Sequence, residues 1–106
     1  ISISDKAGTN KIEVSTMTGN GAINIKAANS LTITVGTTIK VTLNGDSGTV
    51  SISAQQVQIE GSGAVNISSD GMVKVDAAQV TEKASAMYKQ ESNGMFSITG
   101  SPIKIG

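Results

Sequence analysis

Apolar and polar residues alternate in short runs along most of this chain. Between Ser30 and Gly45, Leu31, Ile33 and Val35 share one phase with later apolar residues, while threonines and a lysine occupy the other. A period of two predicts β-strands with one apolar and one polar face. Apolar pairs of this kind recur before residue 80, and the nine pairs are Ile1/Ile3, Ile12/Val14, Ile23/Ile25, Leu31/Ile33, Ile39/Val41, Val50/Ile52, Val57/Ile59, Val65/Ile67 and Val73/Val75. Many successive pairs lie eight residues apart, which predicts a repeat of one short strand and one corner.

The segments between the pairs are rich in Gly, Asn, Asp and Ser, the residues that form sharp corners. An eight-residue step keeps the apolar phase on one face, whereas an eleven-residue step reverses it. Glycines occupy the corners of three eleven-residue steps, namely Gly8, Gly19, Gly21, Gly45 and Gly48. We expect bulges or wider loops at these corners, which would restore the direction of the apolar face.

The composition indicates what this face packs against. The 106 residues include 24 Ile, Leu and Val but only one Tyr and one Phe, and no Cys or His. Since a thin aliphatic core without disulfides or a metal stabilises a small monomer poorly, we expect oligomerisation. The predicted fold is all-β, an intertwined homotrimeric triple-stranded β-helix (β-prism) whose narrow interior suits Ile and Val. Met17 and Met72 are expected to fill its interior.

The last quarter departs from the repeat. Residues 1–80 are predicted to form the β-helical shaft, and residues 81–106 a tip within the same continuous domain. Asn93-Gly94 predicts a type I′ hairpin turn, and Gly100-Ser101-Pro102 a second turn. The tip is therefore predicted as a three-stranded meander over Ala84–Ser92, Met95–Thr99 and Ile103–Ile105, although "TEKASAMYKQ" is also rich in helix formers.

Charge and chemistry-bearing residues exclude several functions. The formal net charge is zero, so no basic face for nucleic acid is expected. Without His or Cys, no catalytic, cofactor or metal site is predicted, and the chain is not expected to be an enzyme. The scattered acids are predicted to be surface carboxylates, and they include Glu13, Asp46, Glu60, Asp70, Asp76 and Glu82. "NGDSG" (44–48) lacks the alternating ligands of known calcium loops and is predicted to be a corner.

The repeat followed by "TEKASA" and a terminal "FSITGSPIKIG" resembles the needle end of contractile injection machines. These are the VgrG-type spike proteins of bacterial type VI secretion and the related tail-lysozyme needle of contractile phages. The resemblance covers essentially the whole chain. Its more specific part is the terminal motif, which comprises Phe96, Ile98, Gly100, Ser101, Ile103, Ile105 and Gly106.

The resemblance implies a homotrimeric needle that punctures a target cell envelope mechanically. It also implies that a cone-shaped PAAR-type protein docks on the tip, through Phe96, Ile98, Ile103, Ile105 and Gly106. The hub and tail tube would join through a missing N-terminal part, since the chain begins mid-pattern at Ile1 and is expected to be a fragment. With no signal peptide evident, the chain would be made in the bacterial cytoplasm and exported by the machine.

Two alternatives stay open at this level. A trimeric tail-fibre or adhesin shaft would share the stacked strands and would expose a receptor-binding surface. A carbohydrate-active β-helix enzyme would be monomeric and would need a cluster of acidic residues.

Overall fold

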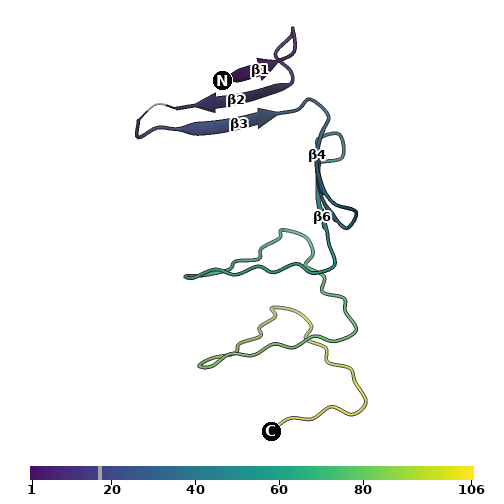
Figure 1. The fold of residues 1–106 in the computed structure, drawn as a ribbon. Helices are drawn as coiled ribbons and strands as arrows, with labels where there is room; N and C mark the ends of the chain where they lie inside the picture. The colour runs from purple at the N-terminus through teal and green to yellow at the C-terminus, as the bar shows by residue number, and fades with distance from the viewer. Residues whose placement is uncertain (17) are drawn as a thin grey trace. The chain divides into compact units, whose positions relative to one another are not determined.

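The computed structural model describes residues 1–16 and 18–106 and contains six β-strands and no helix over them (Figure 1). The strands are β1 (Ser2–Ser4), β2 (Lys11–Ser15), β3 (Ala22–Lys26), β4 (Ser30–Val35), β5 (Ile39–Asn44) and β6 (Thr49–Ser53). They form two antiparallel three-stranded sheets, ordered β1-β2-β3 and β4-β5-β6. The all-β prediction is confirmed at this level. Among the described residues, no helix is long and apolar enough to cross a membrane.

Each of the six strands contains one or both residues of a predicted apolar pair. In the first sheet, Ile12 of β2 lies opposite Ile3 of β1 and Ile25 of β3, and Val14 lies opposite Ile23. Because directly opposed residues of an antiparallel pair point to the same side, this register gathers the apolar residues on one face.

The second sheet follows the same rule over longer strands. Val41, at the centre of β5, lies between Ile33 of β4 and Ile52 of β6, and Leu43 lies between Leu31 and Val50. The opposite face carries Thr, Ser, Asn and Lys. The stripe from Ser30 to Gly45 thus forms a hairpin with itself, an arrangement that the alternation alone does not specify.

The corners are partly as predicted. Gly8, Gly19 and Gly48 have φ values of 72°, 81° and 67°, in the left-handed region that favours glycine. Of the two alternatives expected at these corners, wider loops are observed, at residues 5–10 and 45–48, but no bulge is needed to restore the apolar direction in these hairpins. Since the chain reverses direction at each corner, the register of the antiparallel pair alone returns apolar residues to the same face.

By internal contacts the chain divides into two units, Ile1–Val65 and Asn66–Gly106. All six strands belong to the first unit. The last three predicted pairs, Val57/Ile59, Val65/Ile67 and Val73/Val75, lie in segments without assigned strand in this single chain. Met72 is 77% exposed, and the prediction for Met17 lies outside the described residues.

The predicted C-terminal meander is not formed within one chain. Residues 66–106, all described, contain no strand and no backbone–backbone hydrogen bond. A bend is present at Asn93-Gly94, but neither residue has a positive φ, so the predicted type I′ turn is wrong. The bend is instead closed by Ser92, whose Oγ accepts from the Gly94 amide at 3.2 Å and donates to the Met95 carbonyl at 3.0 Å. The helical alternative for residues 81–90 is not observed either.

Candidate functional site

The most unusual feature of the molecule is its uncovered apolar surface. No described residue, apolar or polar, is buried. Side chains central to the sheets remain open, with Ile33 50%, Leu43 40% and Ile52 60% exposed. The alternation therefore sorts apolar from polar residues on the two faces of each sheet, but within the first unit no described residue buries the apolar side.

The total accessible surface area of the chain also reflects this lack of burial. The chain exposes 10247 Å². A compact monomer of 10.7 kDa would expose about 5,500 Å². Obligate interfaces bury about 2,000–5,000 Å² in total, about half of it on each partner, so the difference of about 4,700 Å² on one chain corresponds to about two such interfaces. The apolar faces of the first unit are thus a candidate interaction surface rather than a core.

Two open hollows mark this surface where the chain passes from the first sheet to the second. One has a volume of about 330 Å³ and the other about 280 Å³. Both are lined by Ile25, Ala27 and Leu31, and the first also by Leu43 and Val50. Apolar hollows of this size can receive side chains that the single chain does not provide.

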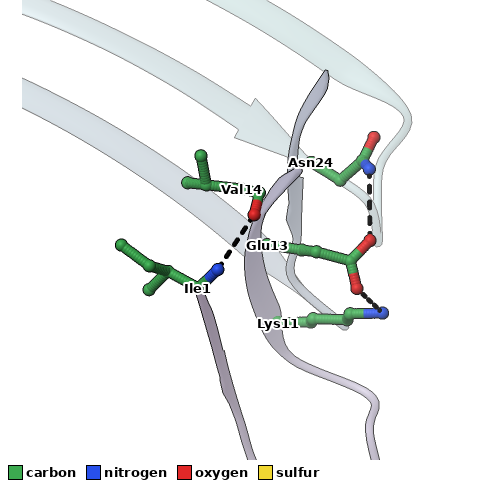
Figure 2. Close-up of polar contacts among 5 residues, drawn as sticks. All are labelled: Ile1, Lys11, Glu13, Val14 and Asn24. Carbon is green, nitrogen blue, oxygen red and sulfur yellow. Dashed lines mark hydrogen bonds and ion pairs between the residues drawn. The ribbon is translucent and has the colours of Figure 1, made fainter. Parts of the chain in front are cut away.

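The opposite face of the first sheet carries a polar cluster (Figure 2). Lys11 Nζ lies 2.7 Å from Glu13 Oε2, and Asn24 Nδ2 donates to Glu13 Oε1 at 3.5 Å. The hydrogen bond from Lys11 and its positive charge lower the pKa of Glu13. On the backbone, the nitrogen of Ile1 donates to the Val14 carbonyl at 2.9 Å, and the Val14 amide donates to Ile1 at 2.6 Å. The two backbone bonds hold Ile1, next to β1, against β2, and the side-chain contacts lie on β2 and between β2 and β3.

The loop between β1 and β2 is organised around Asp5. Its carboxylate accepts from the Thr9 amide at 2.9 Å, the Thr9 hydroxyl at 2.7 Å and Asn10 Nδ2 at 2.8 Å. These bonds, that from the Thr9 side chain first, lower the pKa of Asp5 from its ordinary 3.8 to about 2. The sequence pattern predicted only a Gly-containing corner in this segment. The signal was the acceptor Asp5 placed ahead of two donor side chains, Thr9 and Asn10.

Polar contacts also join the chain at the passage between the sheets. Asn10 Oδ1 accepts from the Ala28 amide at 2.9 Å. One residue further, the Asn29 carbonyl accepts from the Gly45 amide at 2.7 Å, and Asn29 Nδ2 donates to the Asp46 carboxylate at 3.2 Å. These asparagines, which sequence reasoning did not single out, connect residues far apart along the chain through side-chain amides.

The predicted tip residues all lie in the second unit and are open to solvent. Phe96 is 53%, Ile98 59%, Ile103 51% and Ile105 90% exposed. Gly106 ends the chain with a φ of 102°. Within 66–106 no backbone hydrogen bond connects the segment of Phe96 and Ile98 to that of Ile103 and Ile105. The docking role of these residues stays a prediction.

A second group of local polar contacts lies in the first part of the predicted tip, before the terminal motif. The Glu82 carboxylate, through its interaction with the Tyr88 hydroxyl, raises the pKa of Tyr88. Gln90 Nε2 donates to the same hydroxyl at 3.0 Å, and Lys89 forms an ion pair with Glu91 at 3.0 Å. These contacts are local and lie in or next to residues 81–90, the segment for which the sequence pattern was compatible with either a strand or a helix.

Over the described residues there is no group of three or more His, Cys, Asp or Glu side chains placed to hold a metal ion. The carboxylate with the most hydrogen bonds, that of Asp5, is engaged by donors of its own loop. What the molecule offers chemically is exposed apolar surface and unpaired backbone.

Comparison with known proteins identifies no relative: no family model, no curated protein and no solved structure matches this chain.

Proposed function

We propose that three copies of this chain assemble into a β-prism shaft that serves as the cell-puncturing needle of a contractile injection machine. The observation that carries the proposal is the apolar alternation combined with the absence of any buried residue in the described chain. Because ordering a chain costs about 1–2 kcal/mol per residue, an ordered chain with no core needs partners to cover its apolar faces.

The area that must be covered is consistent with three copies. An excess of about 4,700 Å² per chain, shared between two neighbours, gives each pairwise interface an area in the obligate range. Identical chains supply complementary faces by symmetry, and a closed three-fold arrangement leaves no apolar face open.

The second unit supports an intertwined rather than a side-by-side trimer. Its 41 residues from Asn66 to Gly106 have no backbone–backbone hydrogen bond of their own, although their sequence contains alternating apolar and polar residues that predict strands. Since backbone N–H and C=O groups removed from water need partners, neighbouring chains would supply the strand ladder here. Strands shared between chains cannot separate singly, which suits a part that is loaded along its axis.

The needle role itself rests on the resemblance of the repeat and of the terminal "FSITGSPIKIG" to VgrG-type spikes. In this proposal, Phe96, Ile98, Ile103, Ile105 and Gly106 form the platform for a PAAR-type tip protein, and the hub and tail tube attach at the opposite end. The needle is made in the bacterial cytoplasm and is exported by the machine into the target envelope. A single-chain β-helix enzyme is less favoured, because such a fold buries its apolar stripe within one chain.

The test is the native mass of the purified chain, measured by sedimentation and by native mass spectrometry. The expected species has about three times the 10.7 kDa chain mass and persists in warm detergent. A monomer at all concentrations would contradict the proposal, and so would a dimer.

A further inference from the structure

The chain contains Asn-Gly pairs, the sequence in which asparagine deamidates most readily. Two of these pairs differ in the number of hydrogen bonds that restrain their reacting groups. These are Asn44-Gly45 at the end of β5 and Asn93-Gly94 in the second unit. The third pair, Asn20-Gly21, is close in sequence to residue 17, which lies outside the described residues, and is left aside. We propose that Asn93 is a site of spontaneous deamidation and that Asn44 is protected from it by the fold.

The chemistry needs only the chain and water. The backbone nitrogen of the glycine attacks Cγ of the asparagine side chain, and a new C–N bond closes a cyclic imide. The attacking nitrogen gives up its proton, the Cγ–Nδ2 bond breaks, and ammonia leaves. Water then opens the imide at either carbonyl, giving aspartate or isoaspartate. Overall, one water is consumed and one ammonia is released, with no change in oxidation state.

At Asn44-Gly45 both reacting groups are occupied. The Gly45 nitrogen donates to the Asn29 carbonyl at 2.7 Å, so its proton and its direction are held by another segment. Asn44 Oδ1 accepts from the amides of Asp46 at 3.0 Å and Ser47 at 3.2 Å, and these bonds direct the Asn44 side chain toward the loop that follows it. Asn44 is also paired with Thr49 in the strand ladder. Attack would require all three hydrogen bonds to open together.

At Asn93-Gly94 the restraints are few. The Gly94 nitrogen donates only to Ser92 Oγ, at 3.2 Å, and this hydroxyl belongs to an exposed side chain two residues away. Among the residues that the structure describes, none forms a hydrogen bond with the Asn93 side chain, and none lies within 4 Å of the position a Cβ would take on Gly94. The backbone can therefore reach the attack geometry without opening a strand, and in the proposed trimer the pair would still lie at the bend between the predicted strands Ala84–Ser92 and Met95–Thr99.

Two more hydrogen bonds have to break at Asn44 than at Asn93, which predicts deamidation about tenfold or more slower at Asn44. Each event adds one negative charge to a chain whose formal net charge is zero, so charge-resolved chromatography separates the product.

The experiment incubates the full chain in mildly alkaline buffer and follows both sites by peptide mass spectrometry, with a parallel sample in concentrated urea. We expect faster conversion of Asn93 in the native sample and similar rates at both sites in urea. Equal native rates, or a faster rate at Asn44, would overturn the proposal.

Three variants sharpen the test. Gly94→Ala places a methyl group beside the attacking nitrogen in open space and is expected to slow conversion of Asn93 alone. Ser92→Ala removes the one restraint and is expected to accelerate it. Gly63→Ala, where a Cβ also meets nothing within 4 Å, is the matched control and is expected to leave both rates unchanged. An unchanged Asn93 rate in Gly94→Ala would also refute the assignment.

Discussion

Replacing Ile33 by aspartate tests directly whether the apolar face of the second sheet is an interface. Ile33 lies opposite Val41 on that face and is 50% exposed in the single chain. An isolated chain would therefore tolerate the carboxylate, because half of the side chain already meets water. In the proposed trimer, the same position turns inward in all three copies.

The expected cost follows from two contributions. Covering the exposed half of Ile33 contributes about 1 kcal/mol per chain, which the variant loses. Burying an unpaired carboxylate costs several kcal/mol more for each ion. Over three chains the loss is on the order of 10 kcal/mol, and each 1.4 kcal/mol changes an equilibrium constant tenfold. We therefore expect Ile33→Asp to abolish the trimer at micromolar concentrations.

Thr34→Asp is the matched control. It adds the same charge one residue away, on the polar face and opposite Lys40, where an opposite-charge pair is favourable. Sedimentation equilibrium of wild type and both variants is the assay. If Ile33→Asp and Thr34→Asp have the same mass as wild type, the apolar face is not an interface and the reasoning fails.

Two further predictions concern the ends of the chain. The lowered pKa of Asp5 means that its hydrogen bonds stabilise the loop above the ordinary pKa of 3.8 and that this contribution is lost as the pH falls through about 2. Asp5→Asn should therefore lower the thermal midpoint above pH 4, with the difference from wild type shrinking as the pH falls through about 2, and a gap independent of pH would contradict this. At the tip, deletion of Ile103–Gly106 should abolish capture of a PAAR-type partner while leaving the trimer intact, whereas Lys104→Asp should affect capture less. Unchanged capture by the deletion variant, measured by pull-down with purified partner, would exclude the docking role.

Local physics was sufficient for much of the fold. Strict alternation of β-branched and polar residues specifies strands, and all six observed strands coincide with predicted apolar pairs. The corners could equally be predicted from their glycines, because glycine adopts the left-handed conformation of Gly8 and Gly48 without strain. The candidate surface was predictable for the same reason, since alternation already sorts the side chains onto two faces.

Pairing was not predictable from the alternation. Whether β4 pairs with β5 or with a strand of another copy depends on the loop between them and on competing partners, neither of which the period of two encodes. The Asp5 loop and the asparagine contacts at Ala28 and Gly45 join residues that meet only after the hairpins have formed.

The sequence by itself therefore determined where the six observed strands lie, their corners and the division of each strand into an apolar and a polar side, but it also predicted strands between residues 57 and 105 that the single chain does not form. Only the tertiary structure decided that the first six strands close into two antiparallel sheets within one chain. It also decided that neither the sheets nor the remaining residues cover their apolar side chains. The physical reason is that strand formation depends on the alternation of neighbouring residues. Burial instead requires a second apolar surface to pack against the first, and this single chain does not provide one.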